Sequence, residues 1–202
     1  MYNDILKKKK LILASASPRR RELIQKLGLD FEAEVSEADE TLPDYISDPE
    51  AAPEYLSGIK AEAVYNKHTG ENILVVGSDT VVILDGEIYG KPVDEDDAFH
   101  MLKNLSGRWH EVVTGVTLIS GVPGSDIRQQ LSYSVSTRVK FYELSDEEIR
   151  DYIAGGEPMD KAGAYGIQQG GALIVERIDG DFFAVMGLPI ASLSRKLREI
   201  NL

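Results

Sequence analysis

The sequence contains no cysteine. Disulfide bonds, thiolate metal sites and cysteine nucleophiles are therefore excluded, and with them zinc fingers and thiol hydrolases. Long hydrophobic runs are also lacking, because polar residues break every apolar stretch before it could span a bilayer. The basic run Lys7 to Lys10 precedes an apolar stretch, Leu11 to Ala14, that is far too short for the core of a signal peptide. We therefore expect a cytoplasmic protein with no membrane partner.

Basic residues are fewer than acidic ones. The chain has 22 Lys and Arg against 34 Asp and Glu, a formal net charge of −12. Proteins that bind duplex DNA present a basic face, so we expect no nucleic acid partner. With 43% hydrophobic and 28% charged residues, the composition is that of a globular protein. No repeat or flexible linker divides the 202 residues, so we expect a single domain, residues 1–202, of two interleaved lobes.

Hydrophobic periodicity predicts a mixed α/β fold. Asp-Gly pairs at 85–86 and 179–180 are typical of tight turns, so we expect a hairpin at each, the second joining 172–178 to 181–186. Ser145 and Glu148 have the spacing of a helix capping box. The other expected strands are 11–14, 31–35, 73–84 with an interruption at 77–80, 87–89, 109–120 and 130–142, and the expected helices are about 18–27, 53–68, 94–104, 145–154 and 189–200.

Three arginines, Arg19 to Arg21, fall in the first turn of the helix expected from Pro18. Positive charge there opposes the helix macrodipole, at roughly 0.3–1 kcal/mol per charge, so an anion should offset it. Ser15 and Ser17 add donors beside the free N–H groups of the helix start, which together predict a phosphate-sized anion site. The alternative is that the arginines point into solvent and pair with acidic residues. The spacing of a P-loop is absent.

Asp79 lies within the segment Leu74 to Leu84, which is apolar on both sides of Gly77 to Thr80. Burying a lone carboxylate costs several kcal/mol unless a cation or hydrogen-bond donors meet it. We therefore expect the strand to open onto a cleft in which Asp79 meets a metal ion or a basic residue. The alternative is a bulge or turn formed by Asp79 and Thr80.

An acidic segment, Asp30 to Glu50, contains nine acidic residues and no Lys or Arg. Most such runs are solvated faces, and that interpretation suits the greater part of this one. Glu37, Asp39 and Glu40, however, directly follow an expected strand. Carboxylates there could hold a divalent cation together with phosphate oxygens.

Isolated lysines and a glycine-rich loop complete the candidates. Lys60, Lys91 and Lys161 stand among small residues, and Gly90 and Pro92 fix the backbone around Lys91 as a ligand-holding loop requires. For any one lysine, solvent exposure is the alternative. Segment 163–171 permits close backbone approach, and the amide of Gln168 suits the edge of a nucleobase, although a plain surface loop is equally consistent. The histidines show no metal-ligand spacing.

Several separated motifs occur in a fixed order along the chain. Over about Leu11 to Arg198 this set resembles the Maf family of nucleotide pyrophosphatases. The motifs are A-S-A-S-P-R-R from Ala14, G-S-D-T from Gly77, G-K-P from Gly90, L-S-G from Leu105, D-K-A-G-A-Y-G-I-Q from Asp160 and G-L-P from Gly187.

The resemblance implies an α/β fold like that of the inosine triphosphate pyrophosphatases, with an elongated mixed sheet, flanking helices and a cleft between two lobes. It implies hydrolysis of a nucleoside triphosphate to the monophosphate and pyrophosphate with Mg²⁺ or Mn²⁺. The branch that prefers dTTP and UTP is most similar, because its pattern has Arg, Thr and Gln at Arg19, Thr80 and Gln168. Members are also linked to removal of non-standard nucleotides and to inhibition of septum formation. The alternatives are the branch acting on 7-methyl-GTP and a nucleotide-binding regulator of cell division that does not hydrolyse its ligand.

The resemblance also assigns roles to individual residues. Asp79 would be the proton acceptor, and Glu40 with Asp79 the metal ligands. Arg19, Thr80 and Gln168 would select the substrate. Phosphate contacts would come from Ser15, Arg20, Lys60 and Lys91.

Two positions depart from the family pattern. Gln169 stands where a glycine is expected, which affects the loop around Gln168, and Ser78 stands where alanine is common. Homodimers are frequent among related proteins, and edge strands in the long hairpin Trp109 to Tyr142 would supply an interface.

Overall fold

The computed structural model describes residues 8–126 and 128–200, so Lys7 of the basic run lies outside the described residues. The chain forms two compact units, each with its own hydrophobic cluster and each built from separate stretches of sequence. The first unit comprises Met1–Asp79, Thr114–Ser134 and Gly187–Leu202, and the second comprises Thr80–Val113 and Val135–Met186.

A mixed sheet confirms the expected α/β class. Its strand order is β2-β1-β3-β5-β6-β7, with β4 paired to β3. Because β5 lies between β3 and β6, it is not the edge strand that was expected to supply a dimer interface. The strands are β1 (Lys10–Ala14), β2 (Phe31–Glu34), β3 (Ile73–Leu84), β4 (Glu87–Tyr89), β5 (Trp109–Gly121), β6 (Arg128–Phe141) and β7 (Val175–Asp179).

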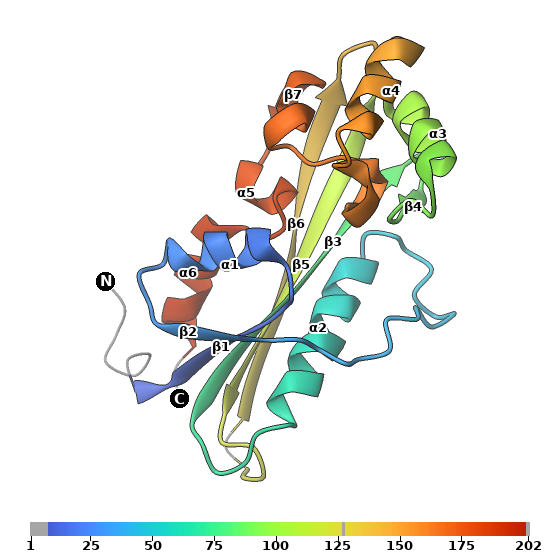
Figure 1. Ribbon diagram of the computed structural model, residues 1–202. Helices are drawn as coiled ribbons and strands as arrows, with labels where there is room; N and C mark the ends of the chain where they lie inside the picture. The colour runs from blue at the N-terminus through green and yellow to red at the C-terminus, as the bar shows by residue number, and fades with distance from the viewer. Residues whose placement is uncertain (1–7, 127, 201–202) are drawn as a thin grey trace. The chain divides into compact units, whose positions relative to one another are not determined.

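Helices flank the strands (Figure 1). No helix among residues 8–126 and 128–200 combines the length and apolar character that crossing a membrane requires. Short 3₁₀ turns lie at Pro158–Asp160, Ala162–Ala164 and Gln169–Leu173. The α-helices are α1 (Pro18–Gln25), α2 (Ala52–Tyr65), α3 (Glu95–Leu105), α4 (Asp146–Ala154), α5 (Phe182–Val185) and α6 (Ile190–Glu199).

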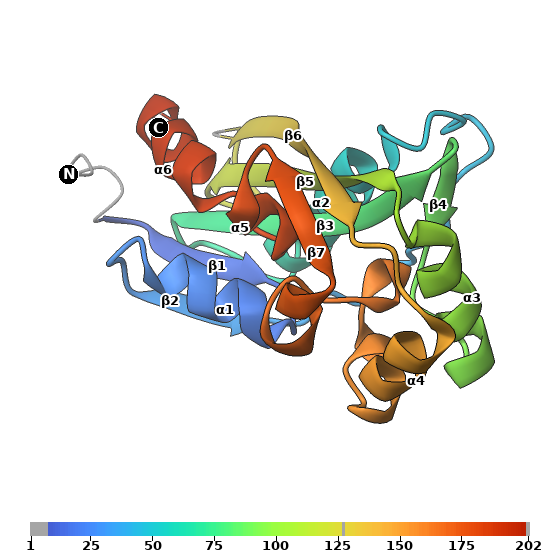
Figure 2. The same ribbon diagram turned by 90° about the horizontal axis from the view of Figure 1, so that it is seen from above.

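In the first unit, β1, β2 and β3 are parallel and β1 lies between the other two. The chain passes outward through α1 to β2 and returns through α2 to β3. Because such crossovers are right-handed, the reversal of direction places α1 and α2 on opposite faces of the strands (Figures 1 and 2). Strands β1 and β2 end side by side at Ala14 and Glu34, whereas β3 continues past this edge to Leu84. The carboxyl edge of parallel strands is the usual ligand position in sheets of this kind.

Helix α2 lies close against the strands because two glycines leave room for it. A Cβ at Gly77 would collide with the backbone oxygen of Ser57, and one at Gly115 with the backbone of Pro53. Apolar side chains pack between α2 and the strands. The buried cluster comprises Ile12, Ala14, Ala61, Val64, Tyr65, Ile73, Val75 and Ile119.

The second unit contains the β3–β4 hairpin, in which Asp85 and Gly86 both have positive φ, as a two-residue turn of this kind requires. Helices α3 and α4 lie side by side in both views, joined by an ion pair between Lys103 and Asp146 at 2.7 Å (Figures 1 and 2). The expected capping box at Ser145 opens α4. The predicted hairpin turn at Asp85-Gly86 and the predicted capping box at Ser145 are therefore confirmed.

Two sequence expectations are wrong. Strand β3 runs through 77–80 without interruption. The hairpin expected at 179–180 does not form, because the Asp181 carboxylate accepts hydrogen bonds from the N–H groups of Phe183 and Ala184 and starts helix α5. Strand β7 instead pairs antiparallel with β6.

Replacing Gly77 by alanine tests how closely α2 lies against β3. The added methyl group would strike helix backbone, so we expect the free energy of unfolding to fall by about 1–3 kcal/mol. Gly58→Ala in α2 is the matched control, because its Cβ would meet only Thr117 Oγ1 at 3.7 Å. That change should leave stability unchanged or raise it by up to about 1 kcal/mol. Urea unfolding measures both, and equal effects would contradict the close approach.

Candidate functional site

Asp79 lies near the carboxyl edge of the parallel strands. The strand register pairs Ala14, the last residue of β1, with Gly77, so β3 continues beyond its neighbour and carries Asp79 past the end of β1. Side chains alternate along a strand, which directs Asp79 to the same face as Gly77 and hence toward α2. Asp79 is buried, with 9% of its surface exposed.

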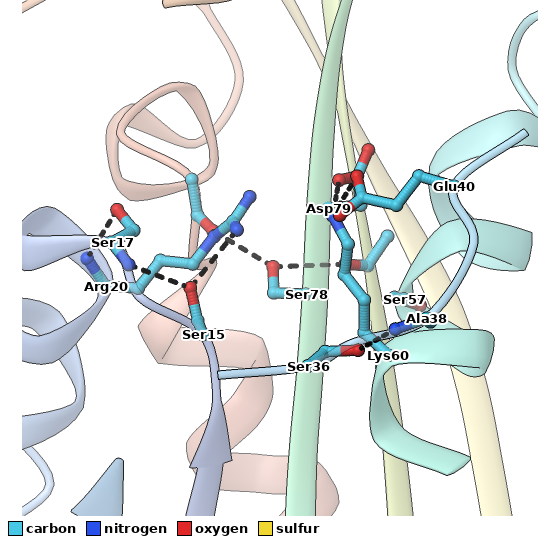
Figure 3. Close-up of polar contacts among 12 residues, drawn as sticks. Ser15, Ser17, Arg20, Ser36, Ala38, Glu40, Ser57, Lys60, Ser78 and Asp79 are labelled. Carbon is cyan, nitrogen blue, oxygen red and sulfur yellow. Dashed lines mark hydrogen bonds and ion pairs between the residues drawn. The ribbon is translucent and has the colours of Figure 1, made fainter. Parts of the chain in front are cut away.

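Lys60 on α2 supplies the cation that this buried carboxylate requires. Its Nζ donates to Asp79 Oδ1 at 2.6 Å and lies 2.8 Å from Glu40 Oε2 (Figure 3). Glu40 comes from the loop that follows β2, and it is exposed. One ammonium group therefore joins carboxylates from a strand and from a loop, and compensates the burial of Asp79.

The other two carboxylates considered in the acidic segment have different contacts. Glu37 lies 3.2 Å from Lys67 Nζ, and Asp39 accepts hydrogen bonds from the backbone N–H and hydroxyl of Thr41. Glu40 is thus the member of this group that the structure brings to Lys60 and Asp79.

The start of α1 lies at the same edge, directly after β1. Ser17 caps the helix by accepting from the backbone N–H of Arg20, and Pro18 occupies the first turn. Ser15 is buried, and its Oγ accepts from the backbone N–H of Ser17 at 3.1 Å. The predicted helix start, its cap and its two serines are therefore present.

The three arginines of this turn differ in their surroundings. The side chain of Arg20 extends from α1 toward Ser15 and Ser78, donating from Nε to the Gly187 carbonyl at 2.8 Å and from Nη1 to Ser15 Oγ at 3.5 Å (Figure 3). Burial lowers the pKa of Arg20, as does neighbouring Arg19, whereas the charges of Asp79 and Glu40 raise it. Arg20 therefore lies within the electrostatic reach of both carboxylates, whereas Arg21 is exposed.

Sequence reasoning missed the contribution of Ser78. This residue is fully buried, and its hydroxyl lies 3.0 Å from the Gly187 carbonyl and 3.1 Å from the Gly115 carbonyl. The Gly187 carbonyl is the one that also accepts from Arg20, so Ser78 and Arg20 meet at a single acceptor. The available signal was a second polar residue beside Asp79 in an apolar strand.

Of the other predicted site residues, Arg19 is half-buried in the first unit, and Thr80, Lys91 and Gln168 belong to the second unit. Thr80 is half-buried, Lys91 is exposed and Gln168 is half-buried. A backbone hydrogen bond of 2.9 Å from the Gly163 N–H to the Gly90 carbonyl ties the loop of Gln168 to the loop of Lys91. The two loops are therefore linked by the backbone within this unit.

Two polar contacts of aromatic side chains hold the Gln168 loop. Tyr165 OH lies 2.7 Å from His110 Nε2, and Tyr152 OH accepts from the Gly166 N–H at 3.1 Å. Burial raises the pKa of both tyrosines and lowers that of His110 to about 4, so all three are neutral near pH 7. His110 is thus a structural core histidine, in agreement with the lack of metal-ligand spacing among the histidines.

Gln169 adopts left-handed backbone geometry, with φ of 52°. Only glycine enters this region without steric cost. The departure noted from the sequence therefore falls at a position where the backbone does favour glycine, directly beside Gln168.

The donor set of the first unit fits a divalent metal ion. Asp79 and Glu40 already converge on one cationic atom, Lys60 Nζ, so a cation can face both carboxylates. Mg²⁺ commonly uses one or two carboxylates together with phosphate oxygens of the substrate, so no larger cluster is needed. Residues 8–126 and 128–200 contain no group of three or more His, Asp and Glu side chains suited to a metal ion. The arrangement suits binding of phosphate oxygens next to a buried carboxylate.

Comparisons with known proteins identify the family of the chain. The dTTP/UTP pyrophosphatase of Acetivibrio thermocellus is 48% identical over 197 residues, covering 95% of this chain and 96% of that protein. Proteins of the same name from Thermotoga maritima and Aquifex aeolicus are 46% and 47% identical, covering 94% and 96% of this chain and 89% and 96% of their own lengths. A family model described as Maf-like protein matches residues 10–200. The chain therefore belongs to the Maf family.

Proposed function

We propose that this protein hydrolyses nucleoside triphosphates, with dTTP and UTP as its preferred substrates, to the nucleoside monophosphate and pyrophosphate. The names of its nearly half-identical relatives support this activity. The observation that carries the proposal is the buried Asp79 at the edge of the parallel strands, joined to Lys60 and within the field of Arg20. A carboxylate and two cations at such an edge suit the reaction of a charged phosphate chain.

Phosphate oxygens would bind at the start of α1. Arg20 presents a guanidinium that is already oriented by the Gly187 carbonyl, and Ser15 contributes its hydroxyl. The partial positive charge of the helix start adds to theirs. Lys60, and Lys91 from the second unit, would supply further positive charge. These groups would stabilise the negative charge that develops on the phosphate oxygens during the reaction.

Hydrolysis requires water to attack the α-phosphorus. A bond forms between the water oxygen and this phosphorus, the bond to the oxygen bridging the α- and β-phosphates breaks, and pyrophosphate leaves with the bonding electrons. Asp79 would either accept the proton of the water or act as a ligand of a divalent cation. Asp79 and Glu40 would hold that cation, Mg²⁺ or Mn²⁺, which when bound neutralises charge on phosphate oxygens and acidifies water.

Recognition of the base is assigned to Arg19, Thr80 and Gln168. The amide of Gln168 offers a donor and an acceptor side by side, which matches the edge of a pyrimidine. Tyr152 contacts the backbone of this loop at Gly166, and His110 contacts Tyr165 in the same loop. These contacts hold the backbone that carries the amide.

A panel of nucleotides tests the activity. We expect pyrophosphate release to be fastest with dTTP and UTP, slower with 7-methyl-GTP and the other triphosphates, and abolished when a chelator removes Mg²⁺ and Mn²⁺. Coupled detection of pyrophosphate gives the rates. Tight binding of UTP without product would instead favour the non-hydrolysing regulator, and fastest turnover of 7-methyl-GTP would favour the other branch of the family.

Asp79→Asn tests the central carboxylate. Removing its charge should lower kcat for UTP by about 100-fold or more, because neither proton acceptance nor cation binding survives. Asp85→Asn is the matched control, since Asp85 is an exposed carboxylate in a turn that tolerates asparagine. Wild-type turnover in folded Asp79→Asn protein, checked by circular dichroism, would overturn both roles of Asp79.

Gln168→Ala tests base selection. The ratio of kcat/KM for UTP to that for other triphosphates should fall by about tenfold, whereas affinity for pyrophosphate should change little, because the amide is assigned to the base alone. Gln25→Ala, on the exposed end of α1, provides the control. An equal loss for every nucleotide would show that Gln168 does not read the base.

A further inference from the structure

Lys60 has two assignments that conflict in the structure. The family resemblance gives it a phosphate contact, yet its ammonium donates to Asp79 at 2.6 Å and lies 2.8 Å from Glu40. These are also the carboxylates expected to hold a divalent cation. One atom of Lys60 therefore occupies the position between the two metal-binding groups.

The two carboxylates hold Lys60 unequally. The Asp79 side chain is 12% exposed and fixed in β3, whereas the Glu40 side chain is 55% exposed on a loop. Lys60 itself has a flexible stem of four carbons and three donors that can rotate. Releasing the ammonium therefore requires changes in an exposed side chain and a flexible one, while the strand that carries Asp79 stays in place.

Charge balance favours such a release. Two carboxylates and one ammonium carry a formal charge of −1 together. A divalent cation in place of the ammonium would make the carboxylate pair neutral and free one positive charge next to the phosphate-binding groups at the start of α1. The ammonium and a metal ion are thus alternative partners for the same two carboxylates.

We propose that Lys60 is an internal counter-ion, which holds Asp79 and Glu40 together in the metal-free protein, is displaced when these carboxylates bind a divalent cation, and then binds substrate phosphate. The proposal rests on the function proposed above and explains how one lysine serves both carboxylates and substrate. It makes nucleotide binding depend on metal binding through a single side chain.

Mn²⁺ binding without nucleotide tests the displacement. Lys60→Met removes the competing charge, so chelator-treated variant should bind Mn²⁺ about tenfold or more tightly than wild type, as measured by the electron paramagnetic resonance of free Mn²⁺. Lys67→Met is the matched control, because it removes the same charge from a lysine that faces Glu37 of the same acidic loop. Its Mn²⁺ affinity should stay within about twofold of wild type.

A second measurement separates this role from a merely structural one. With Mn²⁺ saturating, Lys60→Met should bind the non-hydrolysable α,β-imido analogue of UTP about tenfold more weakly than wild type, because the freed ammonium is missing. The variant thus gains affinity for the metal and loses affinity for the nucleotide. Unchanged or weakened Mn²⁺ binding would overturn the proposal, and so would unchanged nucleotide binding.

Wild-type protein provides a test that does not depend on the folding of the variant. A crystal structure with Mn²⁺ should show the metal bound to Asp79. The distance from Lys60 Nζ to Asp79 Oδ1 should then exceed about 4 Å, beyond ion-pair distance. Metal bound there with the ion pair intact would overturn the displacement. Pyrophosphate release from UTP by the wild type, measured in parallel, reports on the proposed function independently of either result.

Discussion

The cost of burying one carboxylate shapes the candidate site. Asp79 is buried in β3, and burying a carboxylate is costly unless a cation or hydrogen-bond donors meet it. Lys60 is that cation, and it reaches Asp79 because Gly77 lets α2 lie directly against β3. The chemistry of the site and the packing of the first unit therefore depend on the same close approach of helix and strand.

Much of the fold follows from local patterns. The Asp-Gly turn at 85–86 and the capping box at Ser145 are set by residues close together in sequence, and both were predicted. Strand β3 was also predicted, apart from the interruption expected at 77–80. The second Asp-Gly pair led to a wrong prediction because Asp181 can cap a helix as readily as it can follow a turn. Thr137, which is distant in sequence, contacts both the N–H and the carbonyl of Asp181. Local sequence patterns give a wrong prediction where a tertiary contact selects one of two conformations that the local sequence allows.

The same distinction applies to the site. The helix start after β1 and the requirement of Asp79 for a partner were both predictable, because each follows from charge and burial within a short segment. The identity of that partner was not, since Lys60 and Glu40 reach Asp79 only after α2 and the acidic loop are placed on the sheet. The shared use of the Gly187 carbonyl by Ser78 and Arg20 likewise arises from residues more than a hundred positions apart.

The interleaving of the two units has a consequence for the order of events during synthesis. The polypeptide passes from one unit to the other four times, and its last return supplies α6, whose Leu193 and Leu197 are completely buried in the first unit. The unit that contains Asp79 therefore cannot close its core while the ribosome is still translating the middle of the message. Nascent chains must keep this apolar surface uncovered until nearly the whole polypeptide has emerged, a period during which chaperones are typically needed.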